Sequence, residues 1–354
     1  MASIRKLANG NYQATIFVDR DANGKQLRKY ITKSTEKACK AAARELEQEI
    51  YDGRFIDIEN VKLSTWMDKW LELNEQRLSP STFVSYKIYV DAHFKPVLGK
   101  FKLNKINEIH IKEFMNDKLK TLSPTTVRKH ILVLRRILED ALKHKNPARN
   151  VKVPHADEYK PYVLTASEFD LIYNSVKGTR DEVIVLLAAW CGLRRGEIFA
   201  LKPDDINAKT NTIRIDESRS ISEKGYVDKK PKSKNGLRLI AVPEYLMGLL
   251  ETYRKQQRKI TDRIFQLRPD NYSSYFAEMI QKRKLPPIRF HDLRHFHATW
   301  LYNQGIPDHY AAQRLGHDIH VLKGIYQHLN VDRKLDIDDS IRNNLTALNT
   351  AQKV

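Results

Sequence analysis

Three short clusters in the second half of the chain contain the residues best suited to chemistry. CGLRRGE at 191–197 contributes Arg194, HDLRH at 291–295 contributes Arg294 between two histidines, and LGH at 315–317 is followed by Tyr326. Guanidinium groups can bind the free oxygens of a phosphodiester, histidines can move protons, and a tyrosine hydroxyl can attack phosphorus. These residue types therefore indicate phosphoryl transfer to a tyrosine without a metal ion.

The first cluster is expected at the junction of two helices. Residues 181–190 are strongly apolar and predict a buried helix that ends at Gly192, after which Arg194 and Glu197 begin another helix. Free backbone N–H groups at a helix start favour anions, and an arginine there can bind a phosphate through two parallel hydrogen bonds. Taken alone GLRRGE is a weak signal, because Arg-Glu neighbours at a helix start are common on surfaces.

The HDLRH cluster places His291, Arg294 and His295 on one helical face, at positions i, i+3 and i+4. The two histidines also have the spacing of zinc ligands, but the glutamate of H-E-x-x-H is absent and the arginine would crowd a cation, so we expect no metal. Farther along, a helix closes at Gly316, which can cap it, and His317 lies just beyond.

A group of lysines precedes an expected strand at 237–242. The Asn-Gly pair that follows Lys234 is a strong signal for a tight hairpin turn, so this lysine should lie beside the turn. A lysine at such a tip can protonate a leaving oxygen. Lys230 and Lys232 are close enough to leave Lys234 a preference rather than the only choice.

Composition favours a polyanionic partner. The 354 residues suffice for two or three domains, and 62 basic against 43 acidic residues give a net charge of +19, spread along the chain. Nucleic acid is favoured over membrane, with a merely basic soluble protein as the alternative. Cys39 and Cys191 fit small core residues in a reducing cytoplasm, not a disulfide framework. No apolar run reaches the ~18 residues of a spanning helix, so we expect a soluble cytoplasmic protein.

Residues 1–55 predict a hairpin followed by a helix. Alternating apolar residues at 12–18 and 27–31 form the strands, and Ser34 or Thr35 can cap the helix. Its expected apolar stripe consists of Ala38, Ala42, Leu46 and Ile50. Basic residues surround the hairpin, namely Arg20, Lys25, Arg28 and Lys29. A small basic sheet can enter a DNA major groove, whereas a dimerisation or packing module is the alternative.

Residues 61–150 predict a helical domain. Ser79-Pro80 and Ser123-Pro124 each supply an N-cap serine before a proline at the first helical position. The second helix carries an apolar stripe of Val127, Ile131, Leu134 and Leu138. Exposed basic positions that favour a DNA-clamping surface are Lys87, Arg128, Lys129, Arg135 and Arg136. A linker is expected at 151–161, and Thr165 with Glu168 forms a capping box that opens a further domain.

The three clusters resemble those of the tyrosine recombinases, in particular the integrases of phages and integrative elements. The family pattern is T-G-L-R-x-x-E, a hairpin lysine, H-x-L-R-H, then L-G-H and a tyrosine. This chain has C-G-L-R-R-G-E, Lys234, H-D-L-R-H, L-G-H and Tyr326 nine residues after His317. Cys191 replaces the usual threonine, and Phe296 stands where a hydroxyl residue is common. Neither departure removes a catalytic group.

The resemblance spans essentially the whole chain and implies a multidomain α+β protein. Its parts would be a small N-terminal β-hairpin with a helix, an all-α core-binding domain, and a mainly α catalytic domain with a small β-sheet. The expected boundaries are 1–55 for an arm-type DNA-binding domain, 61–150 for the core-binding domain, 151–161 for the linker, 162–335 for the catalytic domain and 336–354 for a C-terminal tail.

The resemblance also implies the mechanism. Tyr326 would attack DNA to form a 3′-phosphotyrosine, Arg194, Arg294 and His317 would stabilise the transition state, and no cofactor or ATP would be needed. His291 would accept the tyrosine proton, Lys234 would protonate the 5′-oxygen, and Glu197 would orient its neighbours. The expected partners are double-stranded attachment-site DNA, three further copies in a tetramer, an excision factor and a host DNA-bending protein.

Three alternatives share much of this pattern. A Xer-like dimer resolvase has the same boxes but usually lacks the N-terminal hairpin domain. A type IB topoisomerase shares the chemistry but acts without a specific site. A catalytically silent DNA-binding protein of the same fold is disfavoured because every catalytic residue type is present.

Overall fold

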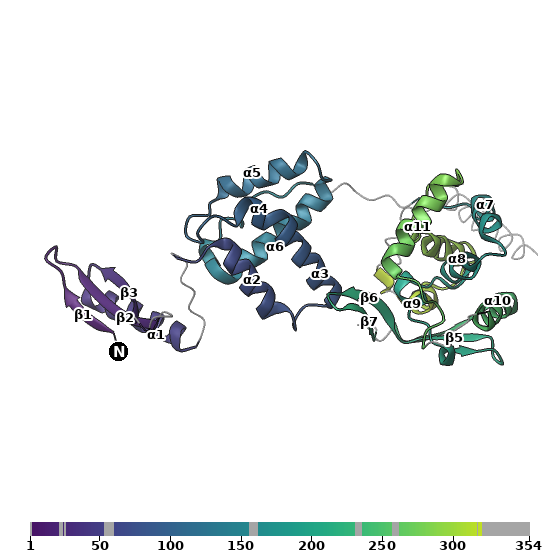
Figure 1. The fold of residues 1–354 in the computed structure, drawn as a ribbon, viewed down its shortest axis with the longest axis horizontal. Coiled ribbons are helices and arrows are strands. Elements are labelled where there is room, and N and C mark those ends of the chain that lie inside the picture. Colours follow the sequence, from purple (N-terminus) through teal and green to yellow (C-terminus); the bar gives the residue numbers. More distant parts are fainter. Residues whose placement is uncertain are drawn as a thin grey trace, which may run out of the picture. The chain divides into compact units, whose positions relative to one another are not determined.

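The computed structural model describes residues 2–20, 24, 26–52, 60–155, 162–230, 236–256, 262–316 and 318–320. Two compact units are present, one formed by 1–74 with 86–156 and the other by 75–85 with 157–354. Helices and small antiparallel sheets make up both (Figure 1), which confirms the predicted α+β class. Within these described ranges no helix is both long and apolar enough to cross a membrane.

The N-terminal region is an antiparallel sheet covered by one helix. Strands β1 (Ser3–Lys6), β2 (Tyr12–Arg20) and β3 (Gln26–Lys33) pair in that order, and α1 (Glu36–Tyr51) packs on the sheet (Figure 1). The hairpin and the Thr35 cap were predicted, whereas β1 was not.

The buried face of α1 differs from the predicted stripe. Cys39 and Ala43 pack against Ala14 and Ile16 of β2, with Leu46 and Ile50 partly buried beside them. Ala38 is exposed, so its assignment to the stripe was wrong. Both Ala38 and Cys39 are small and apolar, and the position of the sheet decides which of them is covered.

The helical region consists of α2 (Leu63–Asn74), α3 (Pro80–Ile88), the π-helical turn η1 (Tyr89–Phe94), α4 (Lys95–Leu98), α5 (Glu108–Leu119), α6 (Pro124–Leu142) and the 3₁₀ turn η2 (Lys143–Lys145). Ser123 caps α6 with Pro124 at its first position, and the four predicted stripe residues of α6 are buried. Trp66 donates from Nε1 to the carbonyl of Ile137 at 2.9 Å, which fixes α2 against α6.

An aromatic cluster lies beneath η1. The His130 ring is 1% exposed, its centroid is 4.5 Å from the rings of both Tyr89 and His93, and neither of its nitrogens has a hydrogen-bond partner among the described residues. Burial, aided by the charges of His93 and Lys118, lowers the pKa of His130 to about 4. The ring is therefore neutral at neutral pH.

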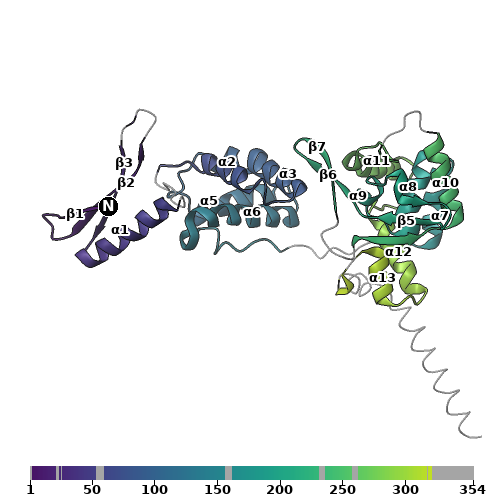
Figure 2. The same ribbon diagram turned by 90° about the horizontal axis from the view of Figure 1, so that it is seen from below.

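The second unit is built around a buried helix. Around α8 (Arg180–Cys191) pack α7 (Ala166–Val176), α10 (Glu244–Lys255) and α12 (Asp292–Asn303), as Figure 2 shows. The short helix α9 (Arg195–Ile198), the turn η3 (Pro203–Asp205), α11 (Pro269–Lys282) and α13 (Asp308–Leu315) complete the helical part. Ten of the twelve α8 residues are buried, as its apolar sequence predicts.

Two small sheets accompany these helices. Strands β4 (Ile206–Asn207), β5 (Thr212–Ile215) and β8 (Arg238–Ala241) form one antiparallel sheet, and β6 (Ser218–Ser222) pairs with β7 (Gly225–Lys229) in a separate hairpin. The register pairs Ile215 with Arg238 and Ile213 with Ile240. Strand β8 falls within the predicted strand at 237–242, and it contacts α13.

We predict that acid weakens the fold through His130. The pKa of His130 lies below the ordinary value of 6.5. The contribution of the neutral ring to the free energy of unfolding is therefore complete above pH 6.5 and is lost as the pH falls towards about 4. This difference corresponds to about 3 kcal/mol in the free energy of unfolding. Urea unfolding at pH 7 and pH 4 should show a larger loss for the wild type than for His130→Phe, and equal losses in the two proteins would contradict the prediction.

Candidate active site

The CGLRRGE segment forms a sharp junction between α8 and α9. Gly192 adopts a left-handed conformation, with φ of +65°, and ends α8 as predicted. Arg194 caps α9, and its backbone N–H donates to Oε2 of Glu197 at 2.8 Å. This local bond turns the Glu197 carboxylate back toward the start of its own helix.

Arg294 lies at the bottom of the site. It is 1% exposed, and its guanidinium donates to the carbonyl oxygens of Gly192 and Leu315, at the ends of α8 and α13. One nitrogen lies 3.8 Å from Oε2 of Glu197. Its Nε is buried and has no hydrogen-bond partner within the described ranges.

Arg194 lies at the surface of the same cluster. Its side chain is 34% exposed and donates to Oε1 of Glu197 and to the carbonyl oxygen of Gly316, each at 2.8 Å. Gly316 ends α13 in a left-handed conformation, as predicted. The structure thus brings together Arg194, Glu197 and Arg294, although up to 100 residues separate them in the chain.

A third arginine belongs to the cluster and was not predicted. Arg238, at the start of β8, is 6% exposed and donates to both oxygens of Glu197, at 3.1 and 2.7 Å. It also donates to the carbonyl oxygens of Gly236 and Arg314, at 3.2 and 2.8 Å. Its position in the sequence was the available signal. Arg238 lies two residues before Ile240, on the same buried face of an apolar strand, where arginine is unusual.

The cluster carries excess positive charge. Burial by itself would raise the pKa of Glu197, but the hydrogen bonds from Arg238 and the charges of Arg238, Arg294 and Arg194 lower it to about 2. One carboxylate therefore faces three guanidinium groups, and two positive charges remain in excess among these residues. A partly buried site with this balance favours an anion such as a phosphodiester.

Histidines of α12 lie beside the arginines. His291 caps the helix and is exposed as a whole residue. Desolvation of its ring by the surrounding protein, together with the charges of His295 and Arg294, lowers its pKa to about 4. The ring centroids of His291 and His295 are 4.8 Å apart. His297, which was not predicted, is buried and accepts a hydrogen bond from Arg314 at 3.1 Å. In the described ranges no group of three or more histidine, cysteine or acidic residues could hold a metal.

The two departures from the family pattern are packing residues. Cys191 is fully buried, and burial raises the pKa of its thiol to about 12. Phe296 stacks on Phe169 with ring centroids 4.8 Å apart. Neither side chain takes part in the arginine cluster.

Three predicted catalytic residues, Lys234, His317 and Tyr326, lie outside the described residues. Their described neighbours still bear on the site. Gly236 accepts a hydrogen bond from Arg238, and Gly316 accepts one from Arg194.

The predicted DNA-contacting residues fall into three groups. Lys25 and the side chain of Arg20 lie outside what the structure describes. Exposed side chains are those of Arg28, Lys87, Lys129 and Arg136, and Lys29 is half-buried. Arg128 and Arg135 are half-buried and donate within their own unit, to Pro154 and to Ala148 and Val151 respectively. These two guanidinium groups hold the segment that follows α6.

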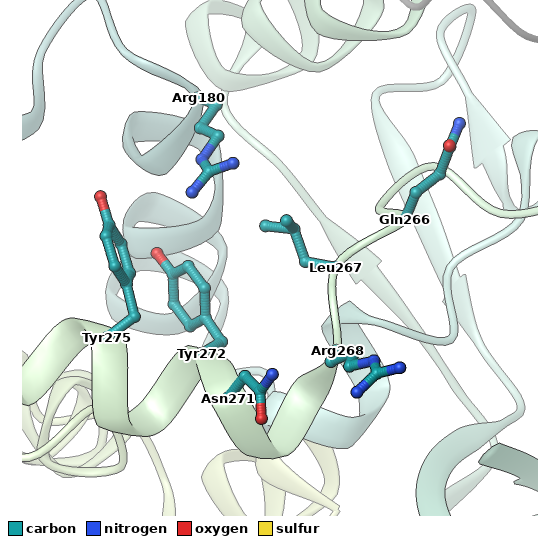
Figure 3. Close-up of a pocket in the computed structure, with 7 residues that line it drawn as sticks. All are labelled: Arg180, Gln266, Leu267, Arg268, Asn271, Tyr272 and Tyr275. Atoms are coloured by element: carbon teal, nitrogen blue, oxygen red, sulfur yellow. The ribbon is translucent and has the colours of Figure 1, made fainter. Parts of the chain in front are cut away.

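A separate pocket of about 320 Å³ shares no lining residue with the arginine cluster. It is lined by Arg180, Gln266, Leu267, Arg268, Asn271, Tyr272 and Tyr275 (Figure 3). Tyr275 donates to Asp181 at 2.7 Å, and Arg180 lies 5.5 Å from the Tyr275 ring centroid. These contacts join the start of α8 to α11.

We predict that Gly192→Ala is far more disruptive than Gly305→Ala. Both glycines have positive φ, but a Cβ at Gly192 would lie 2.6 Å from Leu315 and 2.7 Å from His297, whereas nothing lies within 4 Å at Gly305. Backbone strain costs about 1 kcal/mol at either position, and overpacking adds about 2 kcal/mol at Gly192. Urea unfolding of the two variants measures the difference, and equal destabilisation would contradict the packing shown.

Comparison with known proteins identifies the relatives of this chain. Residues 162–333 match the model of the phage integrase family, and residues 62–119 match the model of the phage integrase N-terminal SAM-like domain. A tyrosine recombinase XerC-like protein of Caldanaerobacter subterraneus is 26% identical, over 93% of this chain and 95% of the relative. The ICEBs1 integrase of Bacillus subtilis is 25% identical, over 96% of this chain and 99% of the relative.

Solved structures show the same fold. The Tn1549 transposon integrase in complex with transposon right-end DNA matches with a TM-score of 0.65 and 18% identity, over 81% of this chain and 99% of that one. A lambda integrase tetramer bound to a Holliday junction matches with a TM-score of 0.58 and 18% identity, over 89% and 95%. With two family models matched and relatives aligned along nearly its full length, the chain belongs to the phage integrase family of tyrosine recombinases.

Proposed function

We propose that the chain is a site-specific integrase that inserts and excises a mobile element through a 3′-phosphotyrosine intermediate. The observation that carries the proposal is the Glu197 cluster, where Arg194 and Arg294 converge and two positive charges remain in excess. A phosphodiester gains negative charge on its free oxygens as it is attacked. The cluster is suited to stabilise that charge.

The proposed residue roles are those that the family resemblance implies. Tyr326 is the nucleophile, Arg194 and Arg294 bind the free phosphate oxygens, and His317 donates a further hydrogen bond to them. The Nε of Arg294 supports its assignment, because this buried N–H is a donor that has no hydrogen-bond partner among the described residues. Glu197 orients both arginines.

His291 is the proposed acceptor of the tyrosine proton. Its pKa of about 4 keeps the ring neutral at neutral pH, as a proton acceptor must be. A bound phosphate would raise that pKa, because a nearby negative charge favours the imidazolium form. His291 would thus become a stronger base when DNA occupies the site.

We further propose how the rest of the chain takes part. Residues 1–55 would bind separate arm-type DNA sites, 61–150 and 162–335 would clamp the core site, 151–161 would link them, and 336–354 would reach a neighbouring protomer. The exposed cations of the sheet and of α6 support the DNA contacts. The lambda relative is a tetramer on a Holliday junction, which supports a tetramer here. The protein would act on DNA in the bacterial cytoplasm, with an excision factor and a DNA-bending protein setting direction.

Dimer resolution is the second candidate function, because one relative carries the name XerC-like. The N-terminal sheet favours integration, since arm-type binding has no use in simple resolution. A plasmid assay distinguishes the two. Integration joins two plasmids that carry different attachment sites, whereas resolution separates two identical sites on one plasmid.

We predict a covalent DNA adduct that needs neither metal nor ATP. Wild type and Tyr326→Phe are incubated in EDTA, without nucleotide, with a nicked duplex that carries the element's own end. An adduct that survives denaturing electrophoresis should form with the wild type alone, because the phosphotyrosine bond requires the hydroxyl. Equal adduct from both proteins, or none from wild type that binds the DNA, would contradict the proposal.

The leaving-group role of Lys234 has its own test. Lys234→Ala should slow cleavage about 10²-fold, as expected for loss of a general acid, and Lys232→Ala serves as the matched control. A duplex with sulfur in place of the bridging 5′-oxygen should restore the rate, since a thiolate leaves without protonation. If Lys232→Ala is the slow variant and is restored by sulfur, the assignment moves to Lys232.

A further inference from the structure

Arg238 donates four hydrogen bonds within the described part of the site. Nη1 and Nη2 each donate to Glu197, Nε donates to the carbonyl of Arg314, and Nη1 also donates to the carbonyl of Gly236. With 6% of its surface exposed, the side chain offers little to a substrate. Its contacts are instead with the groups that surround the phosphate site.

We propose that Arg238 is a positioning residue for strand cleavage: it neutralises Glu197 and thereby leaves the charges of Arg194 and Arg294 available to the phosphodiester. The inference rests on the proposed function. It gives β8 a part in the reaction, because Arg238 of this strand would act through Glu197 without binding the phosphate itself.

Glu197 accepts four hydrogen bonds from the described residues. Arg238 supplies two of them, at 3.1 and 2.7 Å, and Arg194 supplies the other two, both at 2.8 Å, one from its backbone and one from its side chain. Without Arg238, the carboxylate would be paired only with the two arginines proposed to bind phosphate. Their net charge toward DNA would fall from two to one.

Two internal segments meet at Arg238, one just before β8 and one at the end of α13. Gly236 is two residues from Lys234, and Arg314 is three residues from His317. One guanidinium therefore joins β8, α9 and the end of α13. Lysine could keep the charge, but it lacks the planar fork that reaches both carboxylate oxygens and two carbonyls together.

The test is a single-turnover cleavage assay on the nicked duplex described above, in excess protein. The variants are Arg238→Gln, Arg238→Lys, Glu197→Gln and the double variant Arg238→Gln/Glu197→Gln. Arg214→Gln is the matched control, because Arg214 on the neighbouring strand β5 pairs with Asp205 at 2.9 Å outside the cluster. Equilibrium DNA binding and urea unfolding are measured in parallel.

We expect Arg238→Gln to cleave about 10²-fold more slowly, by analogy with the loss of one oxyanion contact. The affinity of Arg238→Gln for DNA should stay near the wild-type value, because many separate contacts with phosphates contribute to it. The cleavage rate of Arg238→Lys should lie between those of Arg238→Gln and the wild type, and the rate of Arg214→Gln should match the wild type. The double variant should cleave at least about tenfold faster than Arg238→Gln, because removing the carboxylate removes the charge that Arg238 neutralised.

The rescue separates charge neutralisation from mere anchoring. If Arg238 only holds the segment before β8 and the end of α13 together, the double variant will cleave as slowly as Arg238→Gln or more slowly, and the proposal is overturned. A folded Arg238→Gln with wild-type rate overturns it as well. If Arg238→Gln does not fold, Arg238→Lys replaces it. A folded Arg238→Lys that cleaves as slowly as Tyr326→Phe also overturns the proposal. No adduct from the wild type would instead refute the proposed function itself.

Discussion

The ionic contacts of the Glu197 carboxylate are the interaction on which the arrangement of the candidate site depends. The carboxylate is almost fully buried, accepts two hydrogen bonds from Arg238 and two from Arg194, and lies 3.8 Å from Arg294. A buried carboxylate is stable only when its charge is matched, and here it is matched in excess. The same excess that keeps Glu197 ionised makes the site attractive to a phosphate. The stability of the cluster and its proposed chemistry thus have one electrostatic origin.

The helix ends explain why residues so distant in sequence meet. Arg294 donates to carbonyls at the ends of α8 and α13, and Arg194 and Arg238 donate to carbonyls of Gly316 and Arg314. Carbonyls at a helix C-terminus lack partners within the helix and carry partial negative charge, so guanidinium groups satisfy them. The left-handed glycines that end these helices leave the carbonyls accessible. Arg194 and Arg294 therefore each have a structural partner as well as a proposed substrate.

Local signals in the sequence predicted much of this. The cap at Ser123-Pro124, the capping box of Thr165 and the glycine ends of α8 and α13 are all as expected, because each is decided within a few residues. What depends on long-range packing was missed: β1, the burial of Cys39 in place of Ala38, and the inward position of Arg238. Arg128 and Arg135 have the spacing of exposed cations, but the chain after α6 returns to accept their hydrogen bonds.

The central claim is that the arginine cluster acts by neutralising the charge on the phosphate. It is tested most directly with Arg194→Ala and a nicked duplex whose scissile phosphate is replaced by an uncharged methylphosphonate. On the normal duplex, Arg194→Ala should cleave ~10²–10³-fold more slowly than the wild type. On the methylphosphonate duplex the gap between the two proteins should shrink to within about tenfold, because there is no charge left to neutralise. An equally large gap on both duplexes would contradict the account.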